Sequence, residues 1–174
     1  QLDTQALLDA CGDKTRAIFI NSPGNPTGWM MESDQQQEIL DFARERGIWI
    51  VADEVYSRLV YDRPVAPSFL DLAEPDDPVI GINSFSKAWA MTGWRMGWGL
   101  WPEQLVPHAQ RLCVNFHSCV NAAAQFAGIE ALQGDQSPVD IMMEAFDARR
   151  KLIHARLNEA PGVRCVMPKG AFYA

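Results

Sequence analysis

Several polar side chains whose groups can do chemistry follow short apolar runs of this sequence. In chain order they are Asn25, Asp53, Tyr56, Ser84, Lys87 and Arg95. They supply an amide, a carboxylate, a phenol, a hydroxyl, an amine and a guanidinium. A lysine amine that is held without its proton can attack an aldehyde and form a Schiff base. The presence of Lys87 among these groups therefore indicates Schiff-base chemistry.

The other groups of the set match the parts of one aldehyde cofactor. An acid such as Asp53 can keep a pyridine nitrogen protonated, and amide or phenol donors can hold a phenolate oxygen. A hydroxyl and a guanidinium, such as those of Ser84 and Arg95, suit a phosphate monoester. These are the parts of pyridoxal phosphate, so the residues predict a site for that cofactor.

The strands of a parallel sheet would bring these side chains to one edge. Residues 16–21, 48–52 and 79–83 are short apolar runs that end near the candidate side chains. Ser33 is expected to cap a helix that ends at Gly47, between the first two runs. This order predicts a βαβ unit and a parallel sheet that is covered on both faces. Ligands bind beyond the carboxyl ends of such strands, which is where the candidate residues stand.

The second half of the chain has a mostly helical pattern. Residues 97–101 are a fourth candidate strand, and amphipathic stretches predict helices over residues 103–120, 122–132 and 137–159. Two short segments, residues 163–167 and 170–174, are expected to begin a small β element. The change of pattern predicts a domain boundary within or just after the third of these helices.

Composition and charge exclude several other classes of protein. The chain has 174 residues and a net charge of −7, which disfavours nonspecific binding to nucleic acid or to an anionic membrane. Hydrophobic residues make up 48%, enough for a sizeable core, yet no stretch approaches the ~20 apolar residues of a membrane-spanning helix. The four cysteines form no C-x-x-C pair and the three histidines no H-E-x-x-H motif. We therefore expect reduced thiols in a cytoplasmic protein, with no disulfide framework and no metal site.

The ordered motifs resemble those of the class I/II aminotransferases, in the aspartate aminotransferase superfamily of pyridoxal-phosphate enzymes of fold type I. These motifs are N-P-T-G at 25–28, D-E-V-Y at 53–56, S-F-S-K at 84–87 and M-T-G-W-R-M-G-W at 91–98. The resemblance runs from residue 16 to the end, where P-K-G-A-F-Y is similar to the family's entry into its small domain. It implies an αβα sandwich with a mostly parallel sheet, plus the start of a small α/β domain.

The resemblance also implies a role for each candidate residue, with Lys87, Asp53 and Tyr56 as the catalytic ones. Lys87 would form the Schiff base and then move the proton between the substrate Cα and the cofactor C4′. Asp53 would keep the pyridine nitrogen protonated. The ring 3-oxygen would be held by Asn25 and Tyr56, and the phosphate by Ser84 and Arg95. Ser86 has no phosphate role, because the family's serine stands three positions before the lysine.

Only part of such an enzyme is expected here. Family members also use a phosphate loop and a stacking aromatic upstream, and a carboxylate-binding arginine downstream, which this sequence does not match. The opening Gln1-Leu2-Asp3 has neither an initiator Met nor a leader pattern, so we expect an internal cut. Residues 1–150 would be the C-terminal part of the large domain, and residues 151–174 the start of the small one. The resemblance implies a homodimer acting on an amino acid and a 2-oxo acid, and a fragment that is inactive alone.

Other functions stay open at this point. The same fold and cofactor residues serve β-lyases, cyclopropane-forming synthases and decarboxylase-like enzymes, and a noncatalytic effector-binding module could retain the fold. Taken singly, the residues also have ordinary structural explanations, such as Asn25 in a turn, Asp53 as a cap and Lys87 as a surface charge. The coincidence of all the motifs in the family's order favours the aminotransferase.

Overall fold

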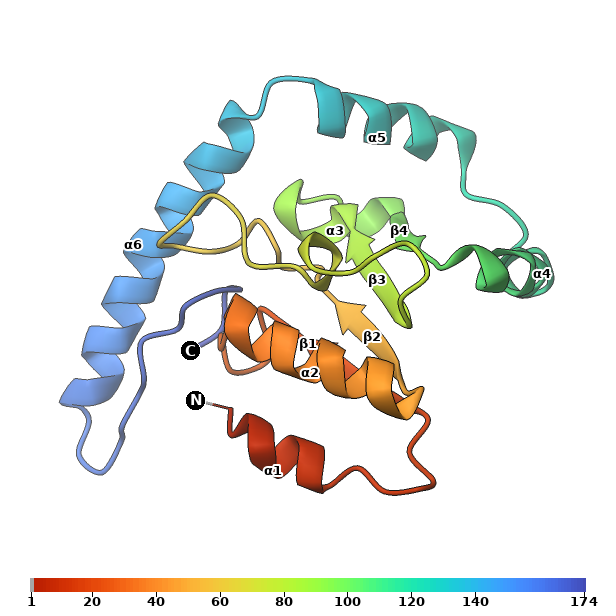
Figure 1. Cartoon of the computed structure of the whole chain (residues 1–174). Helices are drawn as coiled ribbons and strands as arrows, with labels where there is room; N and C mark the ends of the chain where they lie inside the picture. Colours follow the sequence, from red (N-terminus) through yellow and green to blue (C-terminus); the bar gives the residue numbers. More distant parts are fainter. Residues whose placement is uncertain (1) are drawn as a thin grey trace.

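A four-stranded sheet forms the middle of the structure, which is a computed structural model that describes residues 2–174 (Figure 1). The strands are β1 (Ala17–Asn21), β2 (Trp49–Asp53), β3 (Val79–Ser84) and β4 (Gly97–Leu100), and they lie in the order β1-β2-β3-β4. The first three run parallel, whereas β4 runs antiparallel to β3. The predicted strands and the mostly parallel sheet are thus confirmed.

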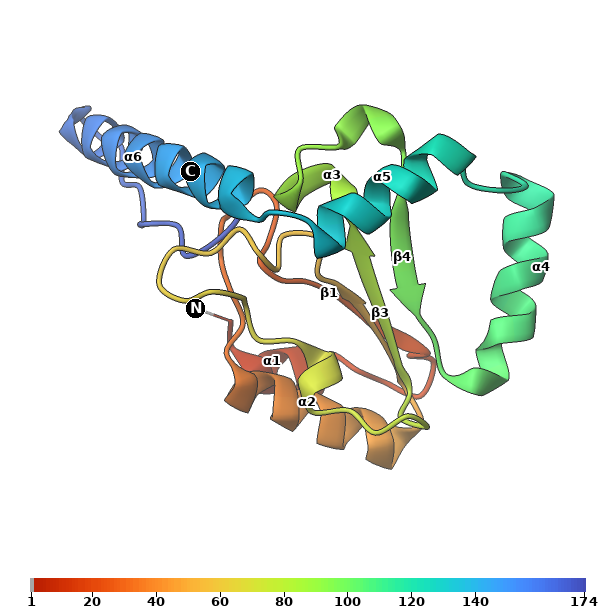
Figure 2. The same ribbon diagram turned by 90° about the horizontal axis from the view of Figure 1, so that it is seen from above.

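Helix α2 (Ser33–Arg46) connects β1 to β2 and completes the predicted βαβ unit. Its N-cap is Glu32, one residue before the expected Ser33, and the Glu32 backbone N–H donates to the Gln35 side chain at 3.4 Å. Ser33 is therefore the first helical residue. Gly47 ends the helix in the left-handed conformation, as expected. Helix α1 (Thr4–Asp9) lies beside α2 on the same side of the sheet (Figure 2).

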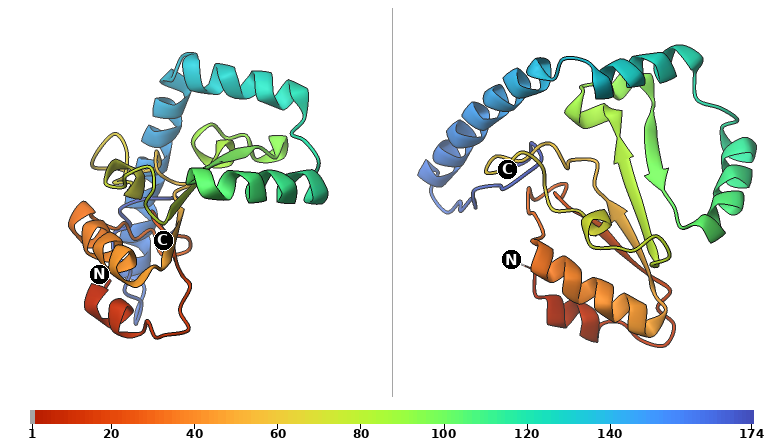
Figure 3. Two further views of the ribbon diagram at one scale, coloured as in Figure 1. Left: turned by 45° about the vertical axis from the view of Figure 1, so that its right-hand side comes forward. Right: turned by 45° about the horizontal axis from the view of Figure 1, so that its top comes forward.

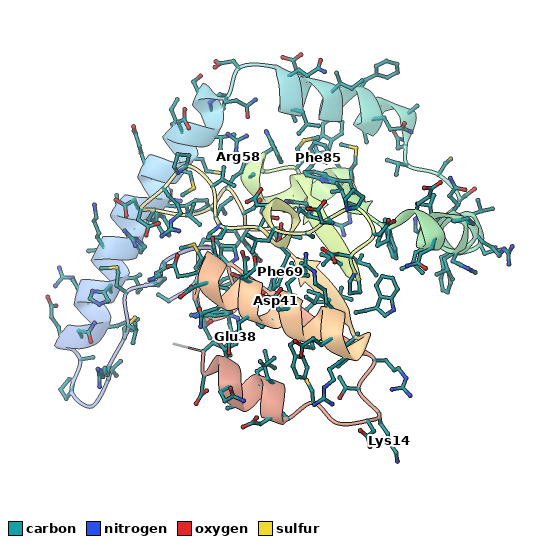
Figure 4. All side chains as sticks on the ribbon, in the orientation of Figure 1. Lys14, Glu38, Asp41, Arg58, Phe69 and Phe85 are labelled. Atoms are coloured by element: carbon teal, nitrogen blue, oxygen red, sulfur yellow. The ribbon has the colours of Figure 1, made fainter. Side chains whose placement is uncertain are left out.

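The main core lies between α2 and one face of the sheet. Its buried side chains come from β1, β2 and α2, and include Ile18, Ile20, Ile50, Ala52, Ile39, Leu40 and Ala43. Phe69, in the short 3-10 helix η1 (Phe69–Asp71), joins this core and lies beside α2 in Figure 4. On the opposite face of β1, Phe19 keeps 64% of its surface exposed, so the described helices leave that part of the sheet uncovered.

Three longer helices form an arc around the β3–β4 side of the sheet (Figure 3). They are α4 (Val106–Phe116), α5 (Ala122–Gln133) and α6 (Ser137–Glu159), and a 3-10 turn over Glu103–Leu105 precedes the first. The three predicted helices are therefore present, although α4 ends at Phe116 rather than near residue 120. Its end is followed by Ser118, whose φ of 63° is incompatible with a continuing helix. Among residues 2–174, no helix is long and apolar enough to cross a membrane.

Helix α6 is continuous across residues 150 and 151, so the predicted domain boundary falls within a helix and stays a prediction. After α6 the chain returns to the sheet, and Figure 1 places its C-terminus between α6 and α2. The small β element expected over residues 163–174 is reduced to one isolated bridge between Val60 and Gly170. The backbone N–H groups of Lys169 and Gly170 instead donate to the Gly28 carbonyl, at 2.8 and 3.0 Å.

We expect Gly28→Ala to destabilise the fold more than Gly47→Ala, because the two glycines share a φ of 62° but differ in surroundings. A Cβ on Gly28 would lie 2.5 Å from the Pro168 Cβ, whereas one on Gly47 would meet nothing within 4 Å. The left-handed backbone alone should cost about 1 kcal/mol in either variant. The clash should add about 1 to 3 kcal/mol in Gly28→Ala only.

Urea unfolding of both variants measures this difference directly. Equal losses of stability would mean that residues 168–170 do not pack on the loop that contains Gly28. A larger loss in Gly28→Ala is the expected result.

Candidate functional site

The register of the sheet places three polar side chains on one face at its carboxyl edge. Asn21 of β1 pairs with Asp53 of β2, and Asp53 pairs with Ile82 of β3. Ser84 lies two residues beyond Ile82, and side chains two apart on a strand share a face. This is also the face on which Phe19 is exposed, because Phe19 lies two residues before Asn21. The site therefore opens on the uncovered side of the sheet.

Asn21 fixes the loop that carries Asn25. Its side-chain amide donates to the Asp53 carbonyl at 3.2 Å, and its side-chain oxygen accepts from the Asn25 backbone N–H at 2.7 Å. The exposed Asn25 is thereby held next to the end of β2. Sequence reasoning missed Asn21, although a polar residue at the last position of a predicted strand is a usable indication of such a role.

Lys87 lies in a one-turn helix, α3 (Phe85–Ala88), that begins where β3 ends. Ser84 caps this turn, because its hydroxyl oxygen accepts from the Ser86 N–H at 3.0 Å. Phe85 anchors the turn beneath α5 (Figure 4), in a cluster with Met96 and Ala124.

The half-buried Lys87 turns toward aromatic rings. Its Nζ lies 5.5 Å from the centroid of the Tyr56 ring and 5.7 Å from that of Phe172. Lys87 therefore packs against aromatic side chains of two other segments. An isolated surface lysine would make no such contacts.

Asp53 carries a partly desolvated carboxyl group. Burial raises its pKa, while the hydrogen bond from the Val55 N–H, at 3.3 Å, and the charge of Lys87 act in the opposite direction. Because burial is the largest of these effects, the ionised form is held less favourably than in water. A cationic partner at this carboxylate would offset that cost.

Glu54, the next residue, has a different role. It is buried and accepts hydrogen bonds from the Ser68 hydroxyl at 2.7 Å and the Phe69 N–H at 3.0 Å. These bonds tie η1 to the end of β2. Burial raises the pKa of this carboxyl too. Glu54 therefore supports the strand end that carries Asp53, and its carboxylate faces the protein interior.

Tyr56 is 2% exposed and meets two aromatic residues from the end of the chain. Its hydroxyl lies 2.9 Å from the Tyr173 hydroxyl, and its ring stands edge-on to Phe172 with centroids 5.5 Å apart. From the sequence, Phe172 and Tyr173 are expected only as part of a small β element over residues 170–174. Their approach to Tyr56 depends on contacts across more than a hundred residues, which no local pattern contains.

Ser84 is hydrogen-bonded to the backbone of the residue that follows Arg95. The Ser84 hydroxyl donates to the Met96 carbonyl at 3.3 Å. Arg95 is exposed, has a φ of 53°, and donates from Nη1 to the Thr92 carbonyl at 2.7 Å. It lines an open hollow of about 820 Å³ together with His117 and Asn121. The structure thus brings both residues to one end of the β3–β4 pair, with the guanidinium open to solvent on one side.

The sheet edge and its loops offer a ligand five kinds of polar group. An amine against aromatic rings, a carboxylate with a raised pKa and a buried phenol come from the ends of β2 and β3. An exposed amide and an exposed guanidinium lie in the neighbouring loops. Within residues 2–174, no group of three or more His, Cys, Asp or Glu side chains is arranged to bind a metal ion.

Comparison with known proteins bears on this arrangement. The family model described as aminotransferase class I and II matches residues 1–174. An aspartate aminotransferase of Streptomyces avermitilis is 40% identical over 176 residues, which cover 100% of this chain and 43% of that protein. An aspartate aminotransferase of Thermotoga maritima is 38% identical over 160 residues, which cover 92% of this chain and 41% of that protein.

Solved structures show the same relation. A crystal structure of an aromatic aminotransferase from Pyrococcus horikoshii has a TM-score of 0.91 and 36% identity, and the match covers 98% of this chain and 46% of that one. A crystal structure of the Thermotoga maritima aspartate aminotransferase has a TM-score of 0.88 and 35% identity, with 98% and 44% covered. The chain thus spans less than half the length of these relatives, with which it shares the α/β fold of aminotransferases. It belongs to the class I and II aminotransferase family.

Proposed function

We propose that this chain is part of a pyridoxal-phosphate-dependent aminotransferase that transfers an amino group from an amino acid to a 2-oxo acid. The observation that carries the proposal is the position of Lys87, whose amine lies against Tyr56 in a turn at the same sheet edge as Asp53. The relatives named above are aspartate and aromatic aminotransferases, which supports the reaction class.

The donor set fits this cofactor. Lys87 offers an amine for an aldehyde, and the desolvated Asp53 carboxylate would gain from a protonated ring nitrogen beside it. Tyr56 offers a phenol from a buried position, and Arg95 offers a guanidinium in an open hollow. Bound pyridoxal phosphate supplies an electron sink for the negative charge left when a proton leaves the substrate Cα.

Each residue then has a task of its own. Lys87 would hold the aldehyde carbon and afterwards move the proton at the substrate Cα. Asp53 would keep the proton on the ring nitrogen. The remaining residues would orient the cofactor: Asn25 and Tyr56 at the 3-oxygen, and Ser84 and Arg95 at the phosphate.

The location and assembly of the whole protein belong to the same proposal. We propose a cytoplasmic homodimer. The thiols of Cys11, Cys113, Cys119 and Cys165 are unpaired within residues 2–174, which fits a reducing compartment. Large apolar side chains on α4 and α5, such as Phe116 and Phe126, are more than 70% exposed, which supports a partner surface there. With less than half of a relative's length, the chain alone would not transaminate.

Borohydride reduction tests the cofactor site. The intact protein that contains this chain should be incubated with pyridoxal phosphate, reduced, digested and mapped by mass spectrometry. The pyridoxyl group is expected on Lys87, because the amine that holds the aldehyde becomes permanently labelled on reduction.

Other lysines of the chain provide the internal comparison. Lys151 and Lys169 are exposed and paired with Asp147 and Glu32, and they should carry little label. Label on such surface lysines in proportion to their exposure, with none on Lys87, would refute the proposed site.

A further inference from the structure

The phenol of Tyr173 contacts the phenol of Tyr56. The Tyr173 and Tyr56 hydroxyls lie 2.9 Å apart, and their rings meet edge-on with centroids 5.9 Å apart. Two hydroxyls joined by one hydrogen bond have one donor and one acceptor. If Tyr173 is the donor, the hydrogen of the Tyr56 hydroxyl is left for another acceptor.

Tyr173 is held in this place by its backbone neighbours. Ala171 is fully buried and its N–H donates to the Leu59 carbonyl at 2.8 Å. The Tyr61 hydroxyl donates to the Ala171 carbonyl at 2.6 Å. Together with the bonds from Lys169 and Gly170 to the Gly28 carbonyl, these contacts fix the segment up to Ala171, two residues before Tyr173. The approach of the two phenols is therefore built into the fold.

The surroundings of the pair combine apolar side chains with nearby charges. Phe172 and, from α6, Met143 and Phe146 pack around Tyr56 and Tyr173. Lys87 faces the Tyr56 ring from α3, and Arg149 and Arg150 of α6 line a hollow together with Tyr173. Because Tyr56 is 2% exposed, the bond between the phenols is shielded from water on that side.

The pKa of Tyr173 is raised, first by its hydrogen bond to Tyr56 and then by burial. The donor follows instead from the ligand atom that Tyr56 would meet: a negatively charged ligand oxygen can only accept, so the Tyr56 hydrogen must point at it and the Tyr56 oxygen must accept from Tyr173.

We propose that Tyr173 is a positioning residue for Tyr56: its hydroxyl donates to the Tyr56 oxygen, which leaves the Tyr56 hydrogen to donate to a ligand oxygen. A phenol that accepts one hydrogen bond is a stronger donor in the next, because the bonds polarise one another. The inference rests on the proposed function in one respect, which is that the ligand oxygen is the 3-oxygen of pyridoxal phosphate. The phenol pair itself needs no cofactor.

The cofactor-free protein tests the bond between the two phenols. Tyrosine labelled with ¹³C at the ring carbon that bears the hydroxyl is followed by NMR against pH, in the intact protein and in Tyr56→Phe. The pKa of Tyr173 is expected to change when the Tyr56 hydroxyl is removed, because the two hydroxyls share one hydrogen bond. A Tyr173 titration that stays the same overturns the inference, because the two phenols are then not coupled.

The loaded protein tests the consequence. The visible absorbance of bound pyridoxal phosphate is followed against pH in Tyr173→Phe and in Tyr61→Phe. The quantity compared is the pH midpoint of the absorbance change. Tyr61→Phe is the matched control, because it removes a hydroxyl that anchors the same segment without reaching Tyr56. A weaker hydrogen bond to the 3-oxygen leaves more negative charge on that oxygen. A proton bound next to it is therefore released at a higher pH. Tyr173→Phe should therefore raise the midpoint by about half a unit to one unit, a three- to tenfold change in proton concentration.

The outcomes separate the two proposals. An unmoved midpoint in Tyr173→Phe, or an equal shift in Tyr61→Phe, overturns the positioning role of Tyr173. Failure of the unmodified protein to take up pyridoxal phosphate overturns the proposed function. In that event the NMR titration still decides whether the two phenols are coupled.

Discussion

Lys87→Ala is expected to reduce transamination by the intact protein by a factor of about 10⁴ or more. The substitution removes the amine that holds the aldehyde and the base that moves the proton, and general acid–base catalysis alone is worth about 10² to 10⁴. The expectation rests on the position of Nζ, which faces Tyr56 and Phe172 at the end of β3. Steady-state rates with an amino acid and a 2-oxo acid measure the loss.

Lys151→Ala is the matched control for this substitution. Lys151 lies on α6, is largely exposed, and pairs with Asp147 at 2.6 Å. Its removal deletes the same charge and side chain far from the sheet edge, so the rate should stay within about twofold, as for most surface substitutions. A Lys87→Ala variant that retained a tenth of the original rate would show that another group does the chemistry.

Asp53→Asn is expected to have opposite effects on rate and stability. The rate should fall by two or more orders of magnitude, because the neutral amide can no longer keep the ring nitrogen protonated. The free energy of unfolding of the cofactor-free protein should rise at neutral pH, because burial raises the pKa of Asp53 and the ionised carboxylate is therefore held at a cost. Asparagine can still accept the Val55 hydrogen bond, so little packing is lost.

The pH dependence follows from the direction of that shift. With a raised pKa the native state binds the proton more tightly than the unfolded chain, so stability falls as pH rises from the ordinary pKa of an aspartate, about 4, through the folded one. The stability gain of Asp53→Asn should be complete above that range and vanish below it. Urea unfolding at a series of pH values measures both limits.

Asp76→Asn serves as the control, since Asp76 is exposed in the loop before β3. It should change neither the rate nor the stability. A stability gain in Asp53→Asn that persisted unchanged at acid pH would contradict the electrostatic explanation.

Local patterns in the sequence predict much of the fold and the order of the candidate residues. The runs that became β1, β2 and β3 are short, apolar and bounded by breakers, and the helix between the first two has a glycine at its end. These features act over a few residues, so they can be recognised without tertiary information. The parallel order then brings Asp53 and Ser84 to one edge by topology alone.

The contacts of the last residues could not be predicted in this way. Phe172 and Tyr173 are separated from Tyr56 by most of the chain, and their place depends on the turn at Ala171 and on the hydrogen bond from the Ala171 N–H to the Leu59 carbonyl. The β-like pattern there predicts a strand, but Gly170 forms only a single bridge. Asn21 was missed for a related reason, since its role depends on which neighbour the sheet register gives it.

Helix α6 has a mechanical consequence. Its 23 residues make a rod of about 35 Å, at 1.5 Å per residue, so a rotation of about 5° at one end would displace the other end by about 3 Å. The rod is held at its start and a little past its middle: Gln136 accepts from Arg58 at 2.6 Å, and Arg150 donates to the Pro168 carbonyl at 2.7 Å. Such a strut cannot swing freely while those contacts hold. Any displacement of α6 must therefore be shared by the loop after β2 and by the segment that carries Tyr173.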